Sequence, residues 1–168
     1  KLIAAFLEKM NPKVTIFSKE NKELRELFTR RNQLVSSMTV QKNHLEKNTN
    51  KEIVKSINRS LTFFKKELAQ IEELITTVID KHHSSEKEIL QSVPGIGKVT
   101  SMSIISTLPE IGQLSGKQIA SLAGLAPKNR DSGQYKGTRS IIGGRKPVRN
   151  NLYMSVISLI RLKDNKLS

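Results

Sequence analysis

The clearest pattern in the chain is a stripe of apolar residues at alternating spacings of three and four between residues 54 and 78. This spacing is typical of the seam of a coiled coil. A second stripe of related spacing crosses residues 19–46, where Arg31 and Gln41 interrupt it. The first stripe consists of Val54, Ile57, Leu61, Phe64, Leu68, Ile71, Ile75 and Val78, and the second of Leu24, Leu27, Phe28, Leu34, Val35, Met38 and Leu45. Because the polar segment KNTNK at 47–51 turns the chain between them, the stripes predict an antiparallel helical hairpin.

A hairpin of two helices leaves part of its apolar seam uncovered. Phe63, next to Phe64 of the seam, widens the surface that has to be hidden from water. We therefore expect the chain to form a homo-oligomer, either a dimer or a tetramer, through the coiled coil. The alternative is an intramolecular bundle, in which the C-terminal half of the chain closes over the hairpin.

Shorter helices follow residue 83. The stretch EKEILQSVPGIGKVTSMSIISTL predicts a helix, a tight turn at residues 94–97 and a second helix. Ser115 and Gln118 form a capping box that opens a further helix, which Gly124 ends. The last helix begins at Pro147, and its predicted buried face consists of Leu152, Val156, Leu159 and Ile160.

The PGIG turn at residues 94–97 has a candidate chemistry. Gly95 and Gly97 permit a backbone in which the amide groups at the start of the second helix face outward, which suits a phosphate. Lys98 adds a positive charge, and Ser101 is small enough for two helices to cross closely. These features resemble the helix-hairpin-helix module, which binds the DNA backbone without reading its sequence. The alternative is a glycine-rich turn that only joins two helices.

The composition indicates a mainly α protein, because 36% of the 168 residues are hydrophobic, 4% aromatic and 26% charged. We predict a long antiparallel helical hairpin or coiled coil, followed by a small helical domain that contains the helix-hairpin-helix motif. The net charge of +14 favours a nucleic acid or an anionic membrane as partner. No apolar run of about 18 residues occurs and no signal peptide opens the chain, which favours DNA or RNA and a cytoplasmic location. Cysteine is absent, which removes disulfides and thiolate metal sites.

The segment NRDSGQYKGTRSIIGGRKPVR at 129–149 is both glycine-rich and basic. Glycines let the main chain approach a phosphate closely, and arginines supply paired donors to phosphate oxygens. We therefore expect a DNA- or RNA-binding loop, and the alternative is a solvated basic loop. The predicted binding residues of the loop are Arg130, Lys136, Arg139, Arg145, Lys146 and Arg149, against the single acidic residue Asp131.

Ser132 lies within this loop between Asp131 and Gly133, where a serine is often only a turn residue. No histidine follows residue 83, which argues against a serine-histidine hydrolase and favours arginine-assisted phosphoryl transfer at Ser132. Tyr135 and Tyr153 are rival nucleophiles. Tyr135 is expected to be exposed on the loop, and Tyr153 to be packed within the last helix. Asp131 is either a local base or a turn former.

Residues 90–156 closely resemble the C-terminal transposase domain of the DEDD-type insertion-sequence recombinases, a family that also includes pilin-gene invertases. The resemblance rests on PGIG, LAGLAP, Asp-Ser-Gly, Gly-Gly-Arg and Arg-x-x-Leu-Tyr in this order. It implies that Ser132 is the catalytic serine, which attacks a DNA phosphate and becomes covalently joined to it. It also implies an N-terminal RuvC-like domain whose four acidic residues hold a divalent metal, Mg²⁺. Some members are guided by a structured RNA.

The opening KLIAAFLEKM looks like the residues that follow the last acidic motif of such a RuvC-like domain. We therefore expect residues 1–18 to be the end of a truncated catalytic domain, 19–83 the coiled-coil hairpin, and 84–168 the C-terminal transposase domain with the serine loop. This fragment would then hold no metal or other cofactor and be inactive alone, as part of a bacterial, nucleoid-associated recombinase. The alternative function is a non-catalytic, dimeric DNA- or RNA-binding module.

Overall fold

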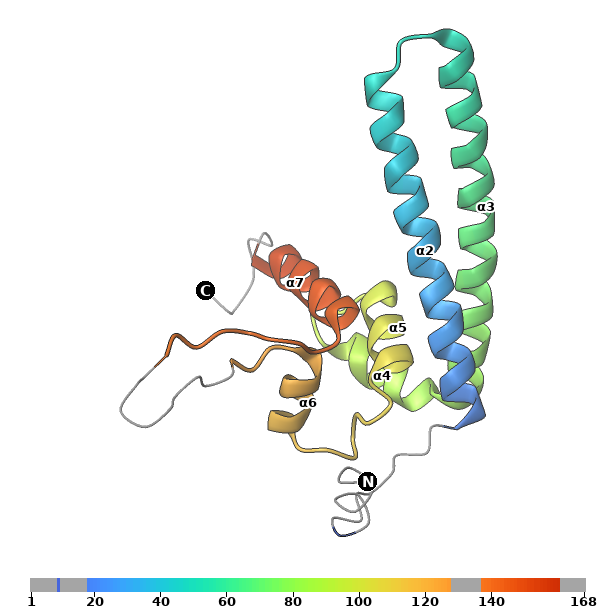
Figure 1. The fold of residues 1–168 in the computed structure, drawn as a ribbon. Coiled ribbons are helices and arrows are strands. Elements are labelled where there is room, and N and C mark those ends of the chain that lie inside the picture. The colour runs from blue at the N-terminus through green and yellow to red at the C-terminus, as the bar shows by residue number, and fades with distance from the viewer. Residues whose placement is uncertain (1–8, 10–17, 128–136, 161–168) are drawn as a thin grey trace.

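The computed structural model describes residue 9 and residues 18–127 and 137–160, and this part of the chain is mainly α-helical (Figure 1). Two long helices form a hairpin, and four shorter helices gather near its base. The six helices of the described residues are α2 (Lys19–Lys47), α3 (Lys51–His82), α4 (Ser84–Ser92), α5 (Lys98–Thr107), α6 (Gly116–Ala123) and α7 (Lys146–Ile160). The predicted fold class is thereby confirmed as mainly α, with a hairpin followed by a small helical region.

Local capping sets the ends of the two long helices. The Ser18 side chain accepts a hydrogen bond from the Asn21 amide at 3.2 Å and begins α2. Asn50 accepts from the Glu52 amide at 3.0 Å and begins α3. Such caps satisfy backbone donors that have no partner inside the helix. The predicted turn at KNTNK is confirmed, because residues 48–50 connect α2 to α3.

Much of both predicted stripes faces the inside of the hairpin, although Val35 of α2 is exposed and Ile79 of α3, which neither stripe includes, is buried. Leu24, Phe28 and Leu34 of α2 are buried, as are Ile57, Leu61, Ile75 and Ile79 of α3. Arg31 lies within the α2 stripe, and its Nε donates to Glu72 Oε1 of α3 at 2.8 Å. Because the charge is paired, the hairpin tolerates the interruption that Arg31 makes in the apolar pattern.

Helix α5 joins the hairpin to the C-terminal helices. Every residue from Thr100 to Ser106 is buried, since one face packs on the hairpin and the other on α6 and α7. The first face adds Met102 and Ile105 to a core of Leu24, Phe28, Ile75 and Ile79. The second face adds Ile104 and Leu108 to a core with Ala123 and Val148.

The two expectations for the seam apply to different parts of the hairpin. At the base, α5 covers the seam, as the alternative of an intramolecular bundle required. Away from the base, large apolar side chains remain exposed, and Phe63 is the most exposed of those on the two long helices at 58%. These side chains are Val35, Val40, Ile53 and Phe63, and Leu74, which is nearer the base, is also exposed. Self-association of this distal part stays a prediction.

The predicted ends of α6 are confirmed, whereas the predicted face of α7 is partly wrong. The Ser115 amide donates to Gln118 Oε1 at 3.0 Å in a capping box, and Gly124 ends α6 with φ 74°. In α7, Val148 and Ser155 are buried, whereas Val156 and Ile160 are exposed. Helix α7 packs on α5 through the face that carries Val148, Leu152, Ser155 and Leu159, and Ser155 Oγ lies 2.8 Å from Thr100 Oγ1. None of the described helices has the length and hydropathy that a membrane span requires.

Candidate nucleic-acid interface

The PGIG turn lies between α4 and α5, and its two glycines differ. Gly95 has φ 84°, and a Cβ there would lie 2.5 Å from Leu159 Cγ of α7. Gly97 has φ −88° and ψ −175°, which is an extended conformation open to any residue, and a Cβ there would meet nothing within 4 Å. Glycine is therefore required at 95 by both backbone and packing, but not at 97 in this conformation.

The start of α5 has the features that the sequence predicts for a phosphate-binding site. Gly97 is the N-cap and has no side chain to accept from the first amides of α5, and Lys98 beside it is exposed. Ser101 is 1% exposed and accepts a hydrogen bond from Gln91 Nε2 of α4 at 3.1 Å. Ser101 therefore lies where α4 and α5 meet, and both the helix-hairpin-helix assignment and phosphate binding by Gly95, Gly97 and Lys98 stay predictions.

The two ends of the basic loop meet at Gly124 and Gly144. A Cβ on Gly144 would lie 2.3 Å from Gly124 Cα, and φ is 74° at Gly124 and 79° at Gly144. The Arg145 amide donates to the Leu122 carbonyl at 2.8 Å. We call this crossing of Gly124 with Gly143, Gly144 and Arg145 the loop neck. It fixes where the loop leaves α6 and where it returns to α7.

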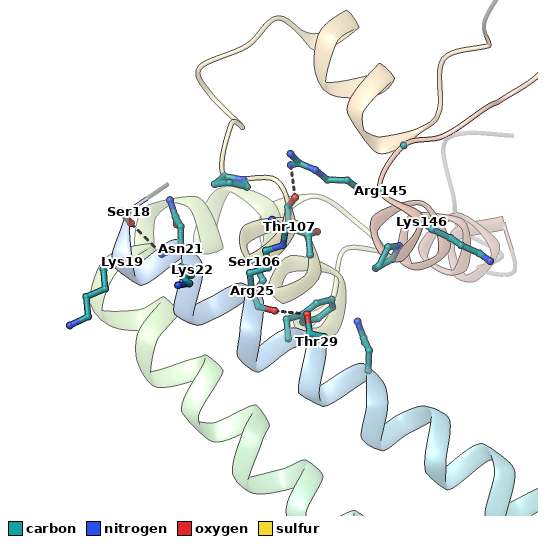
Figure 2. Close-up of a pocket in the computed structure, with 15 residues that line it drawn as sticks. Ser18, Lys19, Asn21, Lys22, Arg25, Thr29, Ser106, Thr107, Arg145 and Lys146 are labelled. Carbon is teal, nitrogen blue, oxygen red and sulfur yellow. Dashed lines mark hydrogen bonds between the residues drawn. The ribbon is translucent and has the colours of Figure 1, made fainter. Parts of the chain in front are cut away.

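The guanidinium group of Arg145 is bound by other groups of the protein. Its Nη1 and Nη2 donate to the Glu110 carboxylate at 2.5 and 2.6 Å, and Nη1 also donates to the Thr107 carbonyl (Figure 2). This hydrogen bond from Arg145 holds the pKa of Glu110 below its usual value, although burial of the carboxyl acts in the opposite direction. Sequence reasoning missed Glu110, yet it is the single acidic residue between residues 89 and 130, which marks it as an ion-pair partner.

Arg149 also binds within the loop neck, whereas two other cations do not. Its Nη1 donates to the Gly143 carbonyl at 3.0 Å and to the Gly124 carbonyl at 3.3 Å. Arg139 and Lys146 are exposed and form no ion pair with any described residue. Of the predicted binding residues of the loop that the structure describes, Arg139 and Lys146 are therefore the ones whose side chains are engaged neither in an ion pair nor in the hydrogen bonds of the loop neck.

The centre of the loop lies outside the described residues. Ser132, Asp131 and Tyr135 fall within residues 128–136, as do Arg130 and Lys136. Their predicted roles stay predictions. Tyr153 is described, and the prediction that it is packed within the last helix is wrong, because it is 65% exposed on the side of α7 that faces away from α5.

The divalent metal that the resemblance implies needs several carboxylate or imidazole ligands close together. No three His, Asp or Glu side chains form such a group in the part of the chain that is described. The described residues therefore do not by themselves form a site for a divalent metal.

Comparison with known proteins finds similarity in the C-terminal part of the chain. Residues 87–168 match the transposase IS116/IS110/IS902 family, and this match includes the PGIG turn, the loop neck and α7. A pilin gene-inverting protein from Moraxella bovis is 34% identical over 91 residues, which are 52% of this chain and 28% of that protein. The chain thus spans little more than a quarter of the length of this relative. Residues 87–168, a little under half of the chain, are therefore similar to a domain of the transposase IS116/IS110/IS902 family.

Proposed function

We propose that the chain is part of a DNA recombinase in which Ser132 performs phosphoryl transfer. The observation that carries the proposal is the family match over residues 87–168, because this match includes the whole loop that holds Ser132. The similarity to this family supports a role in DNA transposition or recombination. The relative from Moraxella bovis, named as a pilin gene-inverting protein, supports a reaction that rearranges DNA.

In the proposed step, Ser132 Oγ attacks a DNA phosphorus. The new Oγ–P bond forms while the bond from phosphorus to one sugar oxygen breaks, so the protein becomes joined to DNA through a phosphodiester. The hydroxyl proton leaves with attack, and the departing sugar oxygen gains a proton. A divalent metal held by a RuvC-like domain, as in the recombinases that the sequence resembles, would stabilise charge on the reacting phosphate.

The loop neck supports this proposal because it gives the loop two fixed ends. Gly124 and Gly144 cross in contact, and Arg149 bonds to carbonyls on both sides of the crossing. Fixed ends restrict the positions that a reactive group on the loop can take, and catalysis requires such a group to be held near the reacting atom. Arg139 lies within the same loop and Lys146 just after it, so both are suited to phosphate contacts.

We further propose that the distal part of the hairpin joins copies of the protein. Its exposed apolar residues, Val40, Ile53 and Phe63 among them, would lose contact with water in a homo-oligomer. DNA strand exchange needs more than one reacting strand end, which an oligomer would bring together. The alternative function, a non-catalytic dimeric DNA- or RNA-binding module, shares this surface but not the covalent step.

The experiment that tests the proposed function traps the covalent product. The complete transposase is incubated with DNA that carries the ends of its own insertion sequence, and protein–DNA adducts are isolated under denaturing conditions. Peptide mapping should locate the DNA on Ser132. DNA binding without any adduct would favour the non-catalytic module instead.

A further inference from the structure

A cavity of about 630 Å³ lies where the first turns of α2 meet the C-terminal helices (Figure 2). One wall is α2 from its cap to Asn32. The other is built by Ser106 and Thr107 at the end of α5, by Pro109, and by residues 144–147, which lead into α7. The cavity thus joins the hairpin to the loop neck. It extends beyond the family match, because α2 lies outside residues 87–168. We call it the α2 groove.

The charge of the α2 groove is all of one sign. Its lining holds five basic residues and no acidic residue. Glu110 neutralises Arg145, as described above. The other four, Lys19, Lys22, Arg25 and Lys146, form no ion pair with any described residue. Cations that surround one concave surface focus a positive potential in it, which favours an anion.

Two polar groups of the lining lack a partner. Ser106 is only 3% exposed, and its Oγ makes no hydrogen bond within the described residues. Asn21 Oδ1 is also buried and makes no hydrogen bond within the described residues, although the backbone amide of Asn21 donates to the Ser18 side chain. A buried polar atom without a partner costs stability, and natural proteins keep few of them. A ligand with both donors and acceptors would satisfy such groups.

The positive surface continues along α2. A second hollow shares Lys22, Arg25 and Thr29 with the groove and adds Arg30, together with one acidic residue, Glu26. Lys19 and Arg30 lie roughly 16 Å apart along the helix at about 1.5 Å per residue. This length exceeds a single phosphate ion and fits a linear polyanion with regularly spaced charges.

We propose that the α2 groove binds the sugar-phosphate backbone of a nucleic-acid strand. The unpaired cations take the phosphates, and hydroxyl and amide groups such as those of Ser106 and Asn21 pair with the sugar. A strand in the groove passes Gly144 and Lys146, so it lies against the neck of the loop that holds Ser132. The inference rests on the proposed function for its class of partner, but it does not depend on Ser132.

The test compares two double variants that lose the same charges. Lys22→Gln with Arg25→Gln changes the groove, and Lys42→Gln with Arg59→Gln changes exposed, unpaired residues of the distal hairpin. Binding of the chain to a fluorescein-labelled DNA duplex and a hairpin RNA is measured from low to high salt. The groove variant should weaken binding of at least one probe about tenfold or more and reduce the salt slope by about 2, since each lost phosphate contact reduces it by about 0.9. The control should change affinity by about twofold or less.

A second measurement uses the unchanged chain and so does not depend on variants that fold. Lysine acetylation is compared with and without the nucleic acid. Lys19, Lys22 and Lys146 should be protected by the probe, whereas Lys42 and Lys51 should stay reactive. Equal effects of the two double variants, without protection of the groove lysines, would overturn the α2 groove while leaving the proposed function intact. A chain that binds neither nucleic acid would contradict both the α2 groove and the proposed function. Polyglutamate serves as an additional probe, and protection of the groove lysines by polyglutamate alone would indicate an acidic protein partner instead.

Discussion

Gly144 crosses Gly124 so closely that a Cβ on Gly144 would lie 2.3 Å from Gly124 Cα. Gly143, the preceding residue, has the same φ of 79° but nothing within 4 Å of a Cβ. The adjacent glycines therefore separate two causes of a glycine requirement. The backbone conformation favours glycine at both positions, whereas close contact with Gly124 requires glycine only at Gly144.

Gly144→Ala is expected to open the loop neck, and Gly143→Ala is its matched control. The left-handed backbone should cost about 1 kcal/mol in either variant, and overpacking should add about 2 kcal/mol in Gly144→Ala. The measurement is hydrogen exchange at the Arg145 amide, which bonds to the Leu122 carbonyl. Equal exchange rates in the two variants would show that the crossing does not hold the neck.

Glu110→Gln is expected to lower the free energy of unfolding by about 2 kcal/mol at pH 7, because it removes a charged acceptor from Arg145. Since the folded protein lowers the pKa of Glu110, its carboxylate stabilises the fold above the ordinary carboxyl pKa, and this contribution is lost as the pH falls through the lowered value. The difference between wild type and variant should therefore shrink below pH 4.5, the ordinary value. Urea unfolding across this range checks it, with exposed Glu73→Gln as control. A difference that is constant with pH would contradict the assigned ion pair.

Two arginines of the basic loop segment should respond differently to loss of charge. Arg139 is exposed and unpaired, so Arg139→Gln should weaken DNA binding and reduce its salt slope by about 1 without changing the melting temperature. Arg149 bonds to the loop neck, so Arg149→Gln should lower the melting temperature and leave the salt slope nearly unchanged. DNA-binding curves and melting curves of both variants distinguish the two roles. A reduced salt slope for Arg149→Gln would instead support the role that the sequence predicts for Arg149, contact with DNA.

Substitutions of Phe63 and Leu61 should have different effects, the first on self-association and the second on folding. Phe63 is 58% exposed and Leu61 is 7% exposed. Phe63→Ser should reduce self-association and keep the helicity of the chain, whereas Leu61→Asp should reduce helicity because it buries a charge within the hairpin. Sedimentation and circular dichroism report the two properties. An unchanged mass for Phe63→Ser would argue against association through the distal hairpin.

The sequence predicted the hairpin well because its information is local. A strict spacing of three and four, with the polar segment KNTNK between the two stripes, is enough to predict two helices and the turn that joins them. It could not predict that α5 is buried on both sides, since the partners of Met102 and Ile104 lie far away in the chain. For the same reason it assigned Val156 and Ile160 to the buried face of α7, where Val148 and Ser155 lie instead.

The candidate site shows the same division. Glycine and arginine content predicted a phosphate-binding loop, but composition does not distinguish an arginine that binds Glu110 from one that remains free for a ligand. It also gave no sign of the α2 groove, because Lys22 and Lys146 meet only in the folded chain. Only tertiary structure shows which cations are already neutralised.

The most direct test of the central claim compares Ser132→Ala with Tyr135→Phe in the full-length protein. Each variant removes one hydroxyl from the same loop and leaves its cations in place, so neither should change affinity for the DNA ends by more than about twofold. Strand transfer and the covalent adduct are then measured on those ends. The account predicts that Ser132→Ala abolishes both and that Tyr135→Phe retains both. Near-normal recombination by Ser132→Ala would contradict it, and loss in Tyr135→Phe alone would assign the nucleophile to the tyrosine.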